Sequence, residues 1–145
     1  MLSRGLRANT KLECLGLDDN SIGDVGARHL AEALVENKHL KIFDVDENHI
    51  GDEGVRAISN TIRKNSSLRE VGLQDNRITR AGMSQLKSAL SENTSLLKLA
   101  VLKNPGSDED MMRKIKDCLK INMKLRRHRA KRSKQTFHNT LMNFE

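Results

Sequence analysis

The sequence predicts an α/β repeat solenoid, with a parallel sheet on its concave side and helices on its convex side. One phrase recurs four times at a spacing of 28 residues, opening at Leu12, Leu40, Leu68 and Leu96. Each phrase places an asparagine eight residues after its opening leucine. Self-similarity at a period of about 20 to 50 residues is typical of a solenoid, in which each repeat buries its apolar face against its neighbours. We number these repeats 1 to 4.

The bulk composition indicates one domain with an aliphatic core, because the chain has 145 residues and neither tryptophan nor tyrosine. We expect residues 1–11 to be the C-terminal half of a truncated repeat, 12–104 the repeats, 105–123 a capping helix and 124–145 a basic tail. The chain has no apolar segment long enough to span a membrane, and its first eleven residues lack the apolar core of a signal peptide. We therefore expect a cytoplasmic or nuclear protein without membrane insertion, with a cytoskeletal or ciliary location also open.

The first residues match the helical part of a later repeat. Residues 2–12 align with 86–96 at a displacement of three periods, so that Leu2 corresponds to Leu86 and Leu6 to Leu90. We expect the chain to start inside the helix of a repeat whose strand is missing, as a fragment or short isoform whose N-terminal edge continues into further repeats. In the alternative, this first helix caps the solenoid by itself.

Each repeat begins with a predicted strand and turn. Leu15 and Leu17 alternate with Cys14, Gly16 and Asp18, which places the leucines on the core face. Strands that run in the same direction stack into a parallel sheet. The recurrent asparagines are expected to be buried and to satisfy backbone groups at the turn, forming a ladder along the solenoid. They are Asn20, Asn48, Asn76 and Asn104.

A helix is predicted to follow each turn, because pairs of apolar residues four apart share a helix face. The pairs are Leu30 and Leu34, Ile58 and Ile62, and Leu86 and Leu90. A glycine recurs at each helix start, where a side chain would crowd the neighbouring backbone or turn; these glycines are Gly26, Gly54 and Gly82. An asparagine recurs at each helix end, where we expect a left-handed conformation; these are Asn37, Asn65 and Asn93.

The repeat pattern ends at Asn104, and a different helix is predicted after it. Ser107 is expected to cap this helix, with acidic residues 108–110 in its first turn. Apolar residues then follow at helical spacing and predict a capping helix: Met111, Met112, Ile115, Leu119, Met123 and Leu125. Two outcomes stay open beyond them, since the helix either continues into the basic segment or ends near Lys124.

The four leucine and asparagine phrases resemble the leucine-rich repeat family, and their 28-residue length resembles its ribonuclease-inhibitor-like class. The resemblance covers residues 2 to about 123. It implies a right-handed α/β horseshoe fragment and an intracellular, non-enzymatic surface for protein interaction. Members of this class include ribonuclease inhibitor, NOD-like receptors and the Ran GTPase-activating protein, and no residue here singles out one of them.

No catalytic constellation emerges from the sequence. None of the five histidines has a second histidine or cysteine at metal-ligand spacing, and there is no glycine-rich phosphate loop. We therefore expect no enzymatic activity, no cofactor and no metal. Cys14 is expected to be an accessible thiol and Cys118 a packing residue.

The candidate binding surface is the exposed side of the predicted sheet. Repeats 1 to 3 place seven acids and no base on it, whereas repeat 4 places two lysines there. Converging carboxylates favour a Lys- or Arg-rich protein partner; the alternative is a solvated face that keeps the sheet soluble. The candidate residues are Cys14, Asp18, Asp19, Ile42, Asp44, Asp46, Glu47, Glu70, Gln74, Asp75 and Lys98.

The second candidate surface is the basic tail, which has seven bases and no acid within residues 124–134. The bases are Lys124, Arg126, Arg127, Arg129, Lys131, Arg132 and Lys134. Such a segment serves nuclear import through an import receptor or binds a polyanion, although no interleaved aromatic indicates base stacking. A solubilising helix end, or contact with the acidic face of another copy, are the alternatives, and the oligomeric state stays open.

Three functions follow from these surfaces. The first is a protein-binding scaffold that uses the concave face. The second is a regulator of a small GTPase that resembles the Ran activator, which would need further repeats and an acidic tail. The third is an adaptor for nucleic acid or another acidic polymer that acts through the basic tail.

Overall fold

The fold is the predicted α/β solenoid, in a computed structural model that describes residues 2–142, with side chains through Ser133. Its strands are β1 (Cys14–Gly16), β2 (Ile42–Asp44), β3 (Glu70–Gly72) and β4 (Lys98–Ala100). Its helices are α1 (Leu2–Ala8), α2 (Gly23–Glu36), α3 (Asp52–Lys64), α4 (Arg80–Glu92) and α5 (Glu109–Met142).

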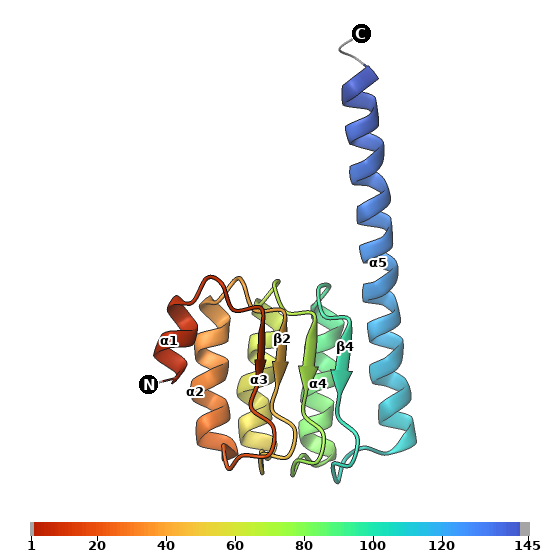
Figure 1. Ribbon diagram of the computed structural model, residues 1–145. Coiled ribbons are helices and arrows are strands. Elements are labelled where there is room, and N and C mark those ends of the chain that lie inside the picture. Colours follow the sequence, from red (N-terminus) through yellow and green to blue (C-terminus); the bar gives the residue numbers. More distant parts are fainter. Residues whose placement is uncertain (1, 143–145) are drawn as a thin grey trace.

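The four strands form one parallel sheet in the order β1-β2-β3-β4. The register equals the sequence period, because Cys14 pairs with Ile42, Ile42 with Glu70, and Glu70 with Lys98. Helices α2, α3 and α4 form a second layer on one side of the sheet, and α5 stands at its C-terminal end (Figure 1). The alternation of side chains across a strand therefore divides each repeat into a core face and an open face.

The core lies between the two layers and is aliphatic apart from Phe43. Phe43 and Val45 are buried, while Ile42 and Asp44, which alternate with them, are half-buried on the open face. This pattern confirms the predicted alternation. Burial is lower at the β1 edge, where Leu12 just before the strand is 37% exposed, than at the β4 edge, where α5 contacts the strand and Leu99 is buried.

The predicted asparagine ladder is present in repeats 2 to 4. The Nδ2 atoms of Asn48, Asn76 and Asn104 donate to backbone carbonyls of the preceding repeat, over 2.8, 3.0 and 2.7 Å. Asn20 is different, since it is exposed and donates to Leu17 and Asp18 within its own turn. The expectation that Asn20 is buried is wrong, because its turn lies at the edge of the stack.

A second asparagine ladder runs along the ends of the helices. The expectation of a left-handed conformation there is wrong, since Asn37, Asn65 and Asn93 are extended, with φ of −69°, −88° and −88°. Their side chains explain the difference. The Nδ2 of Asn65 donates to Leu34 O (2.7 Å) and Asn37 O (2.9 Å), while its Oδ1 accepts from Ser67 N and Leu68 N. The backbone is extended so that one amide can bridge two repeats.

The glycines at the helix starts make room for side chains rather than for backbone. A Cβ at Gly54 would lie 2.7 Å from Ile50 Cγ2 and 2.8 Å from Asp24 Oδ1. The Asp24 carboxylate is there because it accepts from Gly51 N (2.7 Å) and Gly54 N (2.9 Å) at the start of α3. Asp24 thereby caps the helix of the next repeat. Asp52 accepts from Thr79 N (2.9 Å) before α4, and the side chain of Thr79 caps α4 by accepting from Ala81 N (3.2 Å).

Helix α5 starts after Asp108, whose Oδ1 accepts from Met111 N over 2.8 Å. The expectation that Ser107 is the cap is wrong, since its hydroxyl donates to Val101 O at the end of β4 (2.5 Å). Met111 and Ile115 are buried and Cys118 is half-buried against the core.

Beyond Leu119 the contacts of the helix with the repeats are polar: Asn122 is buried, and its Nδ2 donates to Leu96 O over 2.9 Å. Met123 is 41% exposed and Leu125 is 38% exposed, so these two do not belong to the core. The helix continues through the basic segment to Met142 and stands clear of the sheet (Figure 1). None of the helices in residues 2–142 is both long and apolar enough to cross a membrane.

Candidate functional site

The open face of the sheet brings the predicted binding residues together. Cys14, Ile42, Glu70 and Lys98 form one row across the four strands, because they are direct register partners. The next row holds Gly16, Asp44, Gly72 and Ala100. The turns that follow carry the remaining predicted residues, Asp18, Asp19, Asp46, Glu47, Gln74 and Asp75. We call the surface formed by these rows and turns the concave face.

Three carboxylates form a cluster at the centre of this face. Asp44 lies half-buried at the end of β2, and its Oδ1 accepts from Asp46 N over 3.3 Å. Burial raises the pKa of Asp44 to about 6, and the negative charges of Asp46 and Asp18 contribute to the rise. An uncharged carboxyl is favoured where water is excluded and like charges are close. No described basic side chain forms an ion pair with Asp44 that would favour its ionised form.

Asp46 has a fixed orientation within the cluster. Its Oδ1 accepts from Gln74 N (2.6 Å) and its Oδ2 accepts from Gln74 Nε2 (2.8 Å). The two repeats are thereby joined across the concave face by a bidentate contact. Gln74 is thus a positioning residue for Asp46.

A shallow hollow of about 380 Å³ adjoins the cluster, with Asp44, Asp46 and Gln74 among its lining residues. Its apolar wall comes from the C-terminal end of the solenoid, from Leu102, which is 52% exposed, and Met112. The hollow therefore offers carboxylates on one side and apolar side chains on the other.

The acidity of the face is uneven. In repeats 3 and 4, Glu70 pairs with Lys98 (3.1 Å) and Asp75 with Lys103 (3.0 Å). The hydrogen bond and charge of Asp75 raise the pKa of Lys103. In repeats 1 and 2, by contrast, none of five acids forms an ion pair with a described side chain: Asp18, Asp19, Asp44, Asp46 and Glu47. The unpaired negative charge is concentrated over β1 and β2.

The residue before each of Asn20, Asn48, Asn76 and Asn104 has a left-handed backbone, and His49 in repeat 2 has one as well, with a φ of 58°. The φ angles are 52° at Asp19, 55° at Glu47, 49° at Asp75 and 59° at Lys103. Short polar residues tolerate this region, but glutamate and lysine are less usual there. The sequence pattern predicts that these positions lie on the surface, and it does not predict their left-handed conformation.

The basic segment lies on the outer half of α5. Arg126 and Arg129 face the repeats, where Arg129 Nη2 lies 3.4 Å from Thr94 Oγ1. Both side chains are exposed, as are those of Lys124, Arg127, Lys131 and Arg132. The side chain of Lys134, also predicted to bind, lies outside the described residues.

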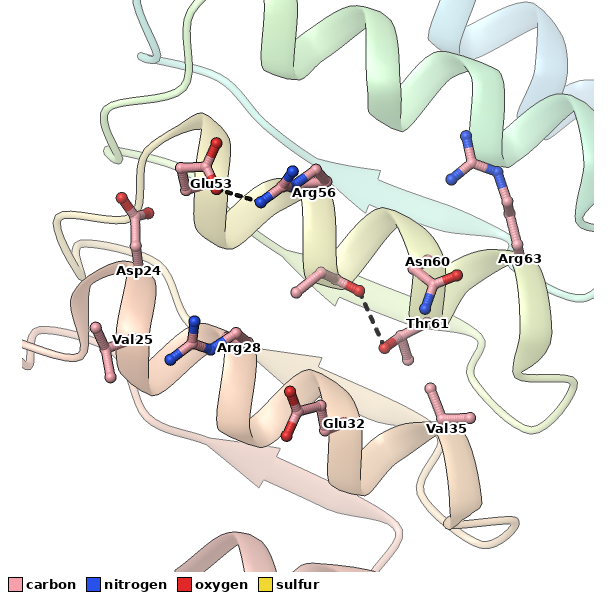
Figure 2. Close-up of a pocket in the computed structure, with 11 residues that line it drawn as sticks. Asp24, Val25, Arg28, Glu32, Val35, Glu53, Arg56, Asn60, Thr61 and Arg63 are labelled. Carbon is pink, nitrogen blue, oxygen red and sulfur yellow. Dashed lines mark hydrogen bonds and ion pairs between the residues drawn. The ribbon is translucent and has the colours of Figure 1, made fainter.

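A groove between α2 and α3 was not predicted from the sequence. It has a volume of about 690 Å³, and charged side chains of both signs line it, including Asp24, Arg28, Glu32 and Arg56 (Figure 2). Glu53 pairs with Arg56 within it. Arg28 and Arg56 occupy the same position of consecutive repeats, and this periodicity on the exposed helix face was the available signal.

The exposed thiol of Cys14 is at the edge of the concave face, as expected. Among the residues that the structure describes, no group of three or more His, Cys, Asp or Glu side chains is placed to hold a metal ion.

Comparisons with known proteins place this geometry in a family. The family described as "Leucine Rich repeat" matches residues 8–31, 36–59 and 64–87. No match was found among curated protein sequences.

Solved structures have the same fold at low sequence identity. One is described as "Leiomodin-1 Actin-Binding Site 2", with a TM-score of 0.71, 19% identity, and coverage of 92% of this chain and 95% of that one. Another is a tropomodulin C-terminal domain from Caenorhabditis elegans, with a TM-score of 0.59, 19% identity, and coverage of 88% and 95%. Three consecutive repeat matches, the 28-residue register and these shared folds agree: the chain belongs to the leucine-rich repeat family.

Proposed function

We propose that this chain is a non-enzymatic protein-binding scaffold, and that its concave face over repeats 1 and 2 binds a partner surface rich in Lys or Arg. The observation that carries the proposal is the unpaired carboxylate cluster, in which the pKa of Asp44 is raised to about 6 by burial and by the charges of Asp46 and Asp18. A cation from a partner would relieve this repulsion, and it would favour the ionised form of Asp44.

The arrangement supports recognition as well as attraction. Asp46 is held by Gln74, so that one carboxylate of the cluster has a defined direction. Beside it, Leu102 and Met112 offer apolar contact. Complementary charge contributes mostly to association rate and specificity, and buried apolar contacts contribute most of the affinity at an interface core.

The test is a charge reversal that preserves the backbone. Lys103 occupies the left-handed position that corresponds to Asp19 and Glu47, so lysine is compatible with this conformation. We expect the variant Asp18→Lys, Asp19→Lys, Glu47→Lys to lose binding to a poly-lysine peptide in fluorescence anisotropy. Its matched control is Glu32→Lys, Glu36→Lys, Glu53→Lys, which changes the net charge equally on the exposed faces of α2 and α3.

The two variants separate the possible results. Loss of binding in the concave variant alone supports the proposal. Equal loss in both variants indicates attraction by net charge, and unchanged binding in both indicates a face that only keeps the sheet soluble. Either of these results overturns the proposal.

A partner can be tested directly. The leiomodin segment of the same fold is an actin-binding site by its description, which makes actin the first macromolecule to test by co-sedimentation with the same two variants. Sedimentation at low and high salt tests whether the basic tail of a second copy occupies the face. The alternative as a regulator of a small GTPase predicts stimulated GTP hydrolysis by a purified GTPase.

A further inference from the structure

Another pocket lies at the N-terminal ends of the strands, at the other end of the sheet from the acidic turns. There the loops before β3 and β4 meet the side of α5. Its volume is about 320 Å³, and each of its eleven lining residues has a polar or charged side chain. Helix α5 passes this edge of the sheet before it extends away from the repeats (Figure 1). Such a lining does not suit an apolar ligand or the apolar face of a helix, because these are recognised by apolar contacts. We call it the polar pocket.

The polar pocket has an excess of positive charge. Glu92 is the only acid among its lining residues, and it already pairs with Arg63 over 3.1 Å. The bases that line the pocket are Arg63, Lys64, Arg69, Arg126 and Arg129. One carboxylate against these five bases leaves four positive charges around a small volume.

Arg69 is held in place before any ligand binds. Its Nη1 donates to Ser66 O (2.8 Å) and to Leu68 O (2.9 Å), and the residue is half-buried. A guanidinium has five N–H donors, and these contacts engage one of its nitrogens. Because the side chain is already ordered, binding through it costs little additional conformational entropy.

Arg126 brings a second guanidinium from α5 towards Arg69. Burial lowers the pKa of Arg69, and the positive charge of Arg126 lowers it further. Two cations that converge without an anion between them repel each other, and a ligand with negative charge removes this repulsion. Neither Arg126 nor Arg129 forms an ion pair with a described acid.

We propose that the polar pocket binds a compact anion that carries two or more phosphate groups. Arginine donates two parallel N–H bonds to phosphate oxygens, and four of the five bases that line the pocket are arginines. Arg63 pairs with Glu92, which leaves Arg69, Arg126 and Arg129 for the ligand. The volume lies at the small end of ligand pockets, which run from about 300 to 1,000 Å³. The ligand is either a soluble polyphosphate or the headgroup of a phosphorylated inositol lipid. This site is separate from the concave face, so its failure would leave the proposed function intact.

The helix provides its own control. Arg126 and Arg129 are three residues apart and share one face of α5. Arg127 and Lys131 lie about 100° and 140° around the helix axis from Arg126, and they are exposed. A double substitution on either face removes the same charge from the same helix.

The experiment measures binding of inorganic tripolyphosphate to the full chain by calorimetry. We expect the variant Arg126→Gln, Arg129→Gln to bind about tenfold more weakly or worse, because each charged hydrogen bond contributes substantially. We expect the control Arg127→Gln, Lys131→Gln to stay within about twofold of the parent chain. Thermal unfolding of each variant confirms that both remain folded, and Arg69→Gln tests the anchor on the repeats.

The outcomes decide the proposal and the source of the ligand. Equal weakening by both doubles, competition by polyglutamate as strong as by tripolyphosphate, or absence of binding to the parent chain would each overturn it. Vesicles containing phosphatidylinositol bisphosphate, compared with phosphatidylserine vesicles of equal charge, form the second arm. Selective vesicle binding that tripolyphosphate displaces assigns the pocket to a lipid headgroup, whereas tripolyphosphate binding without vesicle binding assigns it to a soluble anion.

Discussion

The carboxyl group of Asp44 occupies the space that a side chain on Gly72 would fill. A Cβ at Gly72 would lie 2.6 Å from Asp44 Cγ and 2.9 Å from Asp46 Oδ1, and the two residues are register partners on β2 and β3. Asp44 is half-buried because its carboxylate rests on bare backbone of the next strand. The acidic cluster of the concave face therefore depends on a glycine in the neighbouring repeat.

The first prediction concerns Gly72→Ala. The added methyl group pushes the carboxylate of Asp44 towards water, and we expect the pKa of Asp44 to fall from about 6 towards its ordinary value. The displaced atoms are the end of a flexible side chain, so we expect the free energy of unfolding to change by less than about 1 kcal/mol. Carboxyl chemical shifts followed by NMR through a pH titration measure the pKa. An unchanged value would show that the contact with Gly72 does not bury this group.

The second prediction concerns Asp44→Asn. The pKa of Asp44 is higher in the folded chain than in the unfolded one, so the folded state holds its proton between about pH 4 and pH 6. The contribution of Asp44 to the free energy of unfolding is therefore present at low pH, and it is lost as the pH rises through about 6.

We expect Asp44→Asn to match the parent chain at pH 4 and to be more stable above pH 6 by about 1 kcal/mol. The full shift would correspond to about 3 kcal/mol, and solvent screening at a partly exposed site reduces it. Urea unfolding at several pH values measures the difference. Asp19→Asn, an exposed acid at a left-handed position that suits asparagine, is the control, and a gain there as large would assign the effect to net charge.

The third prediction compares a buried asparagine with an exposed one. Asn65 is buried and makes hydrogen bonds to four backbone groups of two repeats, whereas Asn20 is exposed within its own turn. We expect Asn65→Ala to lower the free energy of unfolding by about 3 kcal/mol, because it leaves buried donors and acceptors unpaired. Asn20→Ala is expected to cost less than about 1 kcal/mol. Chemical denaturation measures both, and equal costs would contradict the role of the second ladder.

The fourth prediction concerns Asp24→Ala, which removes the cap that α2 provides for α3. The variant loses the acceptor for Gly51 N and Gly54 N, and we expect a cost of about 1 to 2 kcal/mol. Hydrogen exchange should then be faster in the first turn of α3 than in the first turn of α4, which Thr79 caps. Uniformly faster exchange in both helices would indicate general destabilisation rather than loss of a cap.

Much of the fold was predictable because the same local pattern of residues occurs in several repeats. The alternation around Leu15, the apolar pairs of the helices and the 28-residue spacing each indicate burial through local geometry. The errors occurred where a residue acts across repeats. Asn65 was expected to adopt a left-handed conformation, and it is extended because its amide bridges Leu34 and Ser67. Ser107 was expected to cap α5, and the nearby carbonyl of Val101 takes its hydroxyl instead.

The candidate site was also predictable only in part. The sequence by itself determined which residues share the concave face, because strand alternation and a constant period place Asp18, Asp44 and Asp46 on one side. Only the tertiary structure decided their charge state and pairing: Lys98 and Lys103 neutralise repeat 3, and Gly72 lets Asp44 become half-buried. It also decided that Arg126 of α5 meets Arg69 of the repeats. The physical reason is that periodicity reports the direction of a side chain, whereas pKa and ion pairing depend on distances between atoms of different repeats.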